Sequence, residues 1–390
     1  MTADKLLAAP RLPDDIATPA YVIDMAALRR NLATAARIRT EAQCKVLLAS
    51  KAFALPAAFP MMREVLDGTT ASGEYEARLG RETFGREVHV YAPAFSEPEV
   101  RRLVGIADHI YFNSASQLER FLPLVKAART STRLEVGIRI NPGYSNATLG
   151  GPLYDPCAPC SRFGATRDTL DGMPWGDIDI LHAHALCESL HEGSIGLIEH
   201  VGREFAAYIA RVKTVNFGGG HFINKPGYDV SALIAAIVRF KTRHGVQVIL
   251  EPGAGLVVDA GWLVATVLDI HRNDKDIAIL DTSASTHMPD VLEVPYTPPV
   301  VGAAPPGIKP HGYILGGKTC MTGDVIGEYS FDRPLRIGDR VVFGDMAQYS
   351  FVKNTTFNGT PLPDIGLLEE DGSYRLVRRF GYQDFVGRLS

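Results

Sequence analysis

The chain has 390 residues, enough for two domains, and its 46% hydrophobic and 22% charged content is typical of globular proteins. Its formal net charge is −4 with acids and bases mixed, which argues against a nucleic-acid-binding face. The N-terminus lacks the apolar core of a signal peptide, and no run approaches the roughly 18 apolar residues of a membrane span, so we expect a cytoplasmic protein without membrane contact.

Short β-rich runs recur along the first two-thirds of the chain, and helical-looking segments separate most of them. Strands that alternate with helices indicate βαβ units and a parallel sheet. Eight such units in roughly 250 residues predict an α/β fold, a (β/α)8 TIM barrel over residues 20–255, with a doubly wound open sheet as the alternative. The runs are KVLLAS (45–50), GTTAS (68–72), EVHVYA (87–92), HIYFNS (109–114), LEVGIRIN (134–141), DILHAH (179–184), TVNFGG (214–219) and VQVILEP (246–252).

Polar residues and glycines gather where these runs end. In a (β/α)8 barrel the carboxyl ends of the strands share one rim, which carries the chemistry. We therefore expect these residues to meet there. They are Lys51, Ser72, Asn113, Asn141, His184, Gly218 to Gly220, and Glu251.

The pattern of predicted strands and helices changes near Gly255. The later runs GWLVATVLDI, DIAILDTSAS, GYILGG and DRVVFGDMAQYSFVK are β-rich, with few long helical intervals between them. They predict a second, mostly β domain over residues 256–390. The segment AYVID, within residues 1–25, is expected to join this domain as a strand.

Two of the rim features have both a structural and a chemical interpretation. Lys51 ends an apolar run, so its amine either reaches water along an apolar stem or is held in a cleft to form an imine with a carbonyl cofactor. The glycine triplet Gly218, Gly219 and Gly220 makes either a tight turn or a set of backbone N–H groups for a phosphate.

Glu251 and His184 are similarly ambiguous when each is considered alone. Glu251 either binds amides of the turn that follows it or pairs with a protonated ring nitrogen, and His184 either has a structural role or stacks on a flat ring. Pyridoxal 5'-phosphate requires a lysine, amides for its phosphate, an acid for its pyridine nitrogen and a face for its ring. The joint placement of these residues predicts that cofactor.

A metal centre is the competing interpretation of the histidines. His182, His184 and His221 would suit a metal-dependent hydrolase, but their spacing is not that of a known ligand set. Cys157 and Cys160 form a C-x-x-C without a second pair, and five cysteines do not suggest a disulfide framework. We therefore predict no metal site.

With these motifs in view, the chain resembles the fold-type-III pyridoxal-phosphate-dependent decarboxylases, whose barrel is alanine-racemase-like. Within them it is most similar to the carboxynorspermidine (carboxyspermidine) decarboxylases. The similarity covers nearly the whole chain; THMPDVLEVPY and GGKTCMTGD are its specific parts, whereas GGGH and EPG are shared across the fold type. Further matching segments are TPAYVID, SKAFA, SGEYEARLG, FNSASQLERF, RINPGYS, HALCE and FGDMAQYSFVKNTTFNG.

The resemblance implies a homodimer with active sites at the subunit interface and a small amino-acid or polyamine substrate. It implies that Lys51 forms the imine, that Gly218 to Gly220 bind the phosphate and that Glu251 binds the ring nitrogen. It further implies that His184 lies against the ring and that Tyr349 lies near the phosphate.

For the substrate, the resemblance implies that Asp290 faces it and that Cys320 and Asp324 reach in from the partner subunit. Cys320 would return a proton to the carbon that loses CO2. The substrate would be a carboxylated polyamine precursor, which loses its α-carboxylate to give norspermidine or spermidine.

One position departs from the family pattern. The polyamine-precursor enzymes usually read E-P-G-E, with the second carboxylate near the cationic tail of the substrate, whereas this chain has Ala254 there. A tail without its counter-charge loses a charge-assisted hydrogen bond, worth very roughly 1.5–3 kcal/mol. Asp290, Asp324, Glu293 and Glu188 are the acids expected to compensate.

Two alternatives therefore stay open. The first is a decarboxylase of the same chemistry that acts on diaminopimelate, ornithine, lysine or a related diamino acid. The second is a non-catalytic pyridoxal-phosphate carrier, although such carriers lack the β domain that follows the barrel here.

Overall fold

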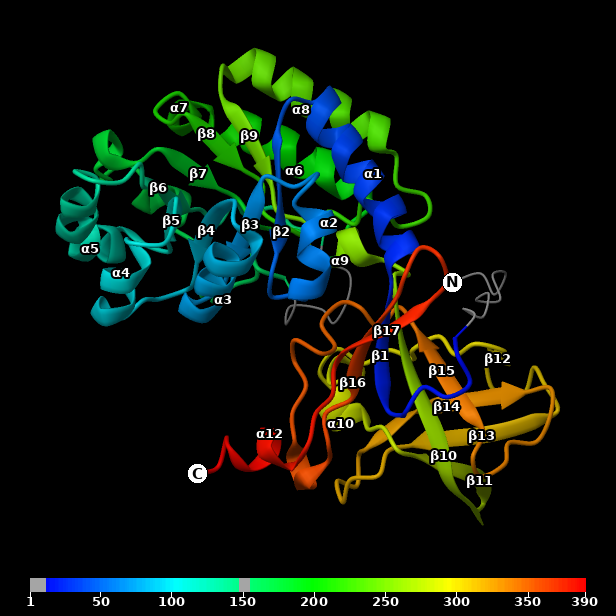
Figure 1. Cartoon of the computed structure of the whole chain (residues 1–390). Coiled ribbons are helices and arrows are strands. Elements are labelled where there is room, and N and C mark those ends of the chain that lie inside the picture. The colour runs from blue at the N-terminus through cyan, green and yellow to red at the C-terminus, as the bar shows by residue number, and fades with distance from the viewer. Residues whose placement is uncertain (1–11, 147–154) are drawn as a thin grey trace. The chain divides into compact units, whose positions relative to one another are not determined.

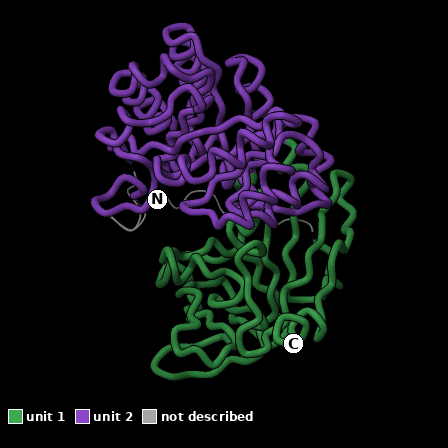
Figure 2. The backbone as a smooth tube through the Cα atoms, turned by 90° about the vertical axis from the view of Figure 1, so that its left-hand side faces the viewer, with its two compact units in different colours: residues 1–29, 257–390 green, residues 30–256 purple. Residues whose placement is uncertain are grey.

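The computed structural model of the chain describes residues 12–146 and 155–390 (Figure 1). It divides into two compact units, one of residues 30–256 and one of residues 1–29 with 257–390 (Figure 2). The prediction assigned residues 20–255 to the barrel, whereas the structure groups residues 20–29 with the second unit.

The first unit is a closed barrel of eight parallel strands. Each strand pairs with the next along the chain, and β2 pairs with β9 to close the ring. The (β/α)8 prediction is confirmed, including the strand predicted for GTTAS, and the open sheet is excluded. The strands are β2 (Lys45–Ala49), β3 (Gly68–Ala71), β4 (Glu87–Tyr91), β5 (His109–Phe112), β6 (Glu135–Arg139), β7 (Ile180–His182), β8 (Thr214–Asn216) and β9 (Gln247–Leu250).

Amphipathic helices surround these strands (Figure 1). In α8 (Val230–His244) the Asp229 side chain caps the first turn at 2.9 Å, and Gly245 ends the helix at φ 68°. Leu233, Ile237 and Phe240, at helical spacing, are buried. The others are α1 (Met25–Glu41), α2 (Phe59–Met62), α3 (Glu74–Leu79), α4 (Glu97–Leu103), α5 (Ala115–Ala128), α6 (His191–Glu204), α7 (Ala206–Ile209) and α9 (Ala254–Val257).

The second unit is mostly β, as predicted. The N-terminal strand β1 (Ala20–Asp24) lies between β10 (Gly261–Asn273), to which it is antiparallel, and β16 (Asp364–Leu368), to which it is parallel. The expected strand AYVID thus joins this sheet. The remaining elements are β11 (Lys275–Leu280), α10 (Ala284–His287), α11 (Asp290–Glu293), β12 (Ala303–Ala304), β13 (His311–Gly316), β14 (Val325–Phe331), β15 (Arg340–Gly344), β17 (Tyr374–Arg378) and α12 (Tyr382–Val386).

Two further features bear on the sequence predictions. Among the described residues, no helix is both long and apolar enough to cross a lipid bilayer. All five cysteines are free thiols, and Cys320 is exposed.

Each unit contains a buried histidine that is held neutral. Burial lowers the pKa of His221 to about 4, and its Nδ1 lies 2.9 Å from Ser194 Oγ. Burial likewise lowers the pKa of His287 to about 4, where Thr282 Oγ1 lies 3.0 Å from its Nδ1.

These histidines predict acid sensitivity within a defined pH window. A base whose folded pKa lies below its unfolded value of about 6.5 takes up a proton on unfolding, so stability falls as pH drops from about 6.5 towards 4. We expect each histidine to remove about 2 kcal/mol of unfolding free energy by pH 5. Urea unfolding between pH 7.5 and 5 measures this loss, and an unchanged unfolding free energy would contradict it. Glu87 and Glu251, whose pKa values are lowered to about 2, do not confuse the result, because their contribution is lost only below about pH 4.5.

Candidate active site

Four of the predicted site features follow four strands that are consecutive around the barrel. His184 follows β7, the glycine triplet follows β8, Glu251 follows β9 and Lys51 follows β2. Because all eight strands are parallel, these residues lie at the same end of the barrel. The barrel closure between β9 and β2 is what brings Glu251 and Lys51, 200 residues apart in sequence, to the same side.

The glycine turn fits closely against both of its neighbours. Gly218 has φ 65°, and a Cβ there would lie only 2.5 Å from His184 Cβ. A Cβ on Gly219 would lie 2.7 Å from the Glu251 carbonyl oxygen. The Gly219 N–H donates to His184 Nδ1 at 3.1 Å, which fixes the imidazole. Side chains are therefore excluded from this turn by contact as well as by backbone conformation.

Lys51 lies beside the Glu-Pro-Gly turn. The Ala49 N–H donates to the Pro252 carbonyl at 3.1 Å, and a Cβ on Gly253 would lie 2.6 Å from Ala52 Cβ. Residues on both sides of Lys51 thus contact the segment that follows Glu251, which fixes the lysine backbone next to that segment.

The Lys51 side chain remains accessible to solvent although the protein surrounds it. That surrounding protein lowers the pKa of its amine, and the Arg139 guanidinium lowers it further. Glu251 and Glu76 oppose this change without cancelling it. An accessible amine with a depressed pKa has a larger neutral fraction, which is the state that attacks a carbonyl.

The Glu251 carboxylate is buried and held as an anion. Asn216 Nδ2 donates to its Oε1 at 2.7 Å, and His182 Nε2 lies 3.5 Å from Oε2, an electrostatic contact rather than a good hydrogen bond. Burial raises the pKa of Glu251, but His182 and Asn216 outweigh that effect and lower it to about 2. A buried carboxylate of this kind suits a protonated ring nitrogen as its partner.

Arg139, at the end of β6, is a site residue that the sequence analysis missed. Its guanidinium lies between the rings of Tyr91 and Phe163, 4.5 and 4.4 Å from their centroids, and donates to the His184 carbonyl at 2.9 Å. The residue is 4% exposed. The sequence signal for Arg139 was an arginine at the end of a short barrel strand. Burial of an unpaired cation is costly, so such a residue needs specific partners.

Three of the acids predicted to lie near the substrate are in the second unit, whereas Glu188 is in the barrel unit, between β7 and α6. The Lys353 ammonium pairs with both Asp290 and Glu293 on α11, so both charges are neutralised within the unit. Burial lowers the pKa of Lys353, but these two acids outweigh burial and raise it. A substrate cation would have to compete with Lys353 for them. Ala254, at the start of α9 in the barrel unit, is buried.

Asp324 is 4% exposed and bonded within its own unit. Its Oδ1 accepts from the Ala284 N–H at 2.8 Å and from Ser283 Oγ at 3.0 Å, and its Oδ2 accepts from Thr319 Oγ1 at 2.6 Å. These bonds hold the loop that carries Cys320; the predicted place of Asp324 near the substrate stays a prediction. The Cys320 backbone N–H is itself held by Asn358 Oδ1 at 2.7 Å.

Tyr349 is half-buried in the irregular segment after β15 and has φ 48°. A positive φ at a tyrosine is unusual and costs free energy, so the surrounding segment must enforce it. Its predicted place near a phosphate stays a prediction.

The structure does not assemble the metal site that the sequence offered as an alternative. The ligand atoms of His182, His184 and Glu251 lie within 4.8 Å of one another, whereas His221 is bonded to Ser194. Burial, Lys51 and Arg139 lower the pKa of His184. The same two positive groups disfavour a divalent cation and favour an anionic or neutral ligand.

Comparison with known proteins places the chain in a family. Residues 20–347 match the family described as "Pyridoxal-dependent decarboxylase, C-terminal sheet domain". The chain belongs to this family. It is an enzyme of the decarboxylase class, and the family's description names pyridoxal as the cofactor.

The similar proteins include two curated enzymes of nearly equal length. The carboxynorspermidine/carboxyspermidine decarboxylase of Campylobacter jejuni is 40% identical, with 95% of this chain and 98% of that protein aligned. The carboxyaminopropylagmatine decarboxylase of Synechocystis is 42% identical, with 99% of each aligned.

Solved structures agree with these relatives. The Campylobacter jejuni carboxynorspermidine decarboxylase, crystallised with norspermidine, superposes with a TM-score of 0.88 at 38% identity and covers 96% of this chain and 100% of that one. Helicobacter pylori diaminopimelate decarboxylase has a TM-score of 0.82 at 17% identity over 96% of this chain and 97% of that one, which shows the shared fold alone.

The contact between the glycine turn and His184 predicts a specific mutational effect. Gly218→Ala and Gly227→Ala both place a side chain at positive φ, which costs about 1 kcal/mol each. A Cβ on Gly227 would meet nothing within 4 Å, so only Gly218→Ala adds a clash, worth about 1–3 kcal/mol. We expect Gly218→Ala to lower the unfolding free energy more and to weaken cofactor binding. Equal effects of the two substitutions on both measurements would contradict this.

Proposed function

We propose that the protein is a pyridoxal-phosphate-dependent decarboxylase that removes the α-carboxylate of a carboxylated polyamine precursor. The observation that carries the cofactor is the placement of Lys51, the glycine turn and a buried Glu251 anion around one end of the barrel. The substrate class is supported by the nearly full-length similarity to relatives whose names specify such precursors.

The residues present fit the cofactor. Within the described part of the chain, the buried Arg139 Nε and both ring nitrogens of His182 lack hydrogen-bond partners, which is uncommon unless a ligand or water completes them. The glycine turn leaves no room for a Cβ at Gly218, Gly219 or Gly220. Orphaned polar atoms beside such a turn suit a phosphorylated, hydrogen-bonding ligand.

Each residue then has a defined task. Lys51 would bind the cofactor aldehyde covalently, His184 would lie against the ring and Glu251 would accept a hydrogen bond from the protonated ring nitrogen. The glycine turn and Tyr349 would bind the phosphate. When bound, pyridoxal phosphate supplies the electron sink that lets an amino acid lose CO2.

Loss of CO2 leaves the substrate carbon in need of a proton. Cys320 is exposed and its backbone is anchored by Asn358, so its Sγ–H is available as the donor. The breaking C–C bond leaves its electron pair on the carbon, and the proton from Sγ completes the new C–H bond. Supply of Cys320 and Asp324 by the partner subunit of a homodimer is part of this proposal.

This chain differs from the expected family pattern at Ala254, a residue expected to lie near the far end of the substrate. Ala254 is buried and uncharged, and Asp290 and Glu293 are paired with Lys353. A cationic tail that displaces Lys353 would restore the missing counter-charge. This favours an extended cationic substrate over a short diamino acid.

A panel of substrates tests the proposal. CO2 release is measured with carboxynorspermidine, carboxyspermidine, carboxyaminopropylagmatine, diaminopimelate, ornithine and lysine, with Lys51→Ala as the inactive control. We expect the carboxylated polyamine precursors to give kcat/KM values at least about 100-fold above the diamino acids, as the loss of charged tail contacts implies. Activity confined to the diamino acids would reject the substrate class, and no release from any compound would favour a non-catalytic carrier.

A further inference from the structure

The interior of the barrel contains a path of buried polar side chains. Interiors of (β/α)8 barrels are usually filled by branched apolar residues. Here His89 on β4, Tyr111 on β5 and Asn216 on β8 are each completely buried. Because β5 and β8 are not neighbours, the contact between Tyr111 and Asn216 crosses the barrel interior.

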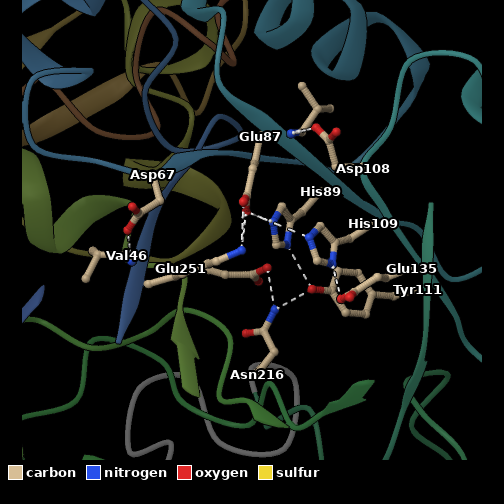
Figure 3. A network of polar contacts seen from close by, with 12 residues as sticks. Val46, Asp67, Glu87, His89, Asp108, His109, Tyr111, Glu135, Asn216 and Glu251 are labelled. Atoms are coloured by element: carbon tan, nitrogen blue, oxygen red, sulfur yellow. Dashed lines mark hydrogen bonds and ion pairs between the residues drawn. The ribbon is translucent and has the colours of Figure 1, made fainter. Parts of the chain in front are cut away.

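This path is continuous from one end of the barrel to the other (Figure 3). Asn216 Nδ2 lies 2.7 Å from Glu251 Oε1 and 3.0 Å from the Tyr111 hydroxyl. That hydroxyl lies 2.9 Å from His89 Nδ1, and His89 Nε2 lies 3.2 Å from Glu87 Oε2. Glu87 begins its strand, whereas Glu251 follows the end of its own.

The direction of every hydrogen bond along the path can be assigned. The Gly218 N–H donates to Asn216 Oδ1 at 2.8 Å, so the Asn216 amide nitrogen faces Glu251 and Tyr111 and donates to both. The Tyr111 oxygen accepts that bond, and its own hydrogen goes to His89 Nδ1. His89 is therefore protonated on Nε2, which donates to Glu87.

Glu87 is the fixed charge at the far end of the path. Lys45 Nζ lies 2.7 and 2.8 Å from its two oxygens. Burial raises the pKa of Glu87, but the hydrogen bonds from His89 and Lys45 outweigh burial and lower it to about 2. An ionised Glu87 can only accept, and so it imposes the Nε2–H tautomer on His89.

We propose that Glu87, His89, Tyr111 and Asn216 form a positioning chain. The Glu87 charge fixes the His89 tautomer and the direction of the Tyr111 hydroxyl, so that the Tyr111 oxygen accepts from Asn216 and, together with Gly218, holds the Asn216 amide in place to donate to Glu251, the ionised acceptor of the cofactor's ring nitrogen. The inference rests on the proposed function, because the ring nitrogen belongs to pyridoxal phosphate. In this positioning chain the first three residues act through Asn216.

Other charged and titratable groups face the chain from the surrounding strands. His109 stacks on His89 with centroids 3.8 Å apart, and burial beside His89 lowers the pKa of His109 to about 2, so it is neutral. These groups are unchanged in the variants below and form a constant background. They are Lys45 and Lys51 on and after β2, His109 on β5, Glu135 and Arg139 on β6, and His182 and His184 on and after β7.

The test follows the absorption of the resting holoenzyme as a function of pH, without substrate. The variants are Tyr111→Phe, which removes the hydroxyl and keeps the ring, Glu87→Gln, which removes the charge, and the double variant. Tyr208→Phe is the matched control, since its hydroxyl donates to Asp171 at 2.8 Å outside the barrel interior.

We expect Tyr111→Phe to raise the apparent pKa of the proton shared by Glu251 and the ring nitrogen by about half a pH unit, because an Asn216 amide that has lost its second acceptor is held less firmly and donates less well to the carboxylate. The kcat should fall by about threefold with KM changed less. Glu87→Gln acts on Asn216 through Tyr111, so the part of its shift that passes through the hydroxyl should vanish in the Tyr111→Phe background, leaving only the direct effect of the lost charge, which lowers the same pKa. The Tyr208→Phe titration should equal that of the wild type.

A Tyr111→Phe titration equal to that of the wild type would overturn the proposed positioning chain, and so would shifts that add in the double variant. Either result would leave the proposed function intact. A wild-type protein that binds no pyridoxal phosphate would reject the proposed function and this inference together. A lower unfolding temperature with an unchanged titration would show a structural role and would also overturn the chain.

Discussion

The buried charge of Glu251 is the constraint on which the site depends. Transfer of a carboxylate out of water costs several kcal/mol unless hydrogen bonds and opposite charge replace its hydration. Asn216 supplies the hydrogen bond at 2.7 Å, and His182 lies close to the second oxygen. The Glu251 oxygens can accept further hydrogen bonds, which suits a protonated ring nitrogen. Because a buried carboxylate is costly without such a partner, its burial favours a cationic ligand.

Closure of the barrel brings the other site residues close to Glu251. The Glu251 carbonyl is approached by the glycine turn after β8, and the turn that follows Glu251 contacts the residues around Lys51 after β2. Burial depresses the pKa of Lys51, and Arg139 depresses it further and also holds the backbone of His184. The amine, the acid and the turn are therefore placed by backbone contacts between neighbouring strands rather than by flexible side chains, which is how a scaffold maintains catalytic geometry.

The sequence was sufficient for the fold and for the outline of the site. Strand and helix periods alternate clearly, and parallel strands carry their end residues to one rim, so Lys51, His184 and Glu251 could be grouped without coordinates. Asn216 and Tyr111 could not, because in strands of three or four residues a polar side chain gives no sign of which face it occupies. The hydrogen bonds of Asp324 could not be predicted either, since its partners Ser283 and Ala284 lie about 40 residues away in sequence.

The most direct measurement of the central claim is the identity of the lysine that binds the cofactor. The protein is purified with pyridoxal phosphate, reduced with borohydride, digested and mapped by mass spectrometry. We expect the reduced adduct on Lys51, in the segment that joins β2 to α2, and a Glu251→Gln variant should still carry it there, because that substitution changes the ring environment and not the amine. An adduct on another lysine, or none in the wild type, would contradict the account of the site given above.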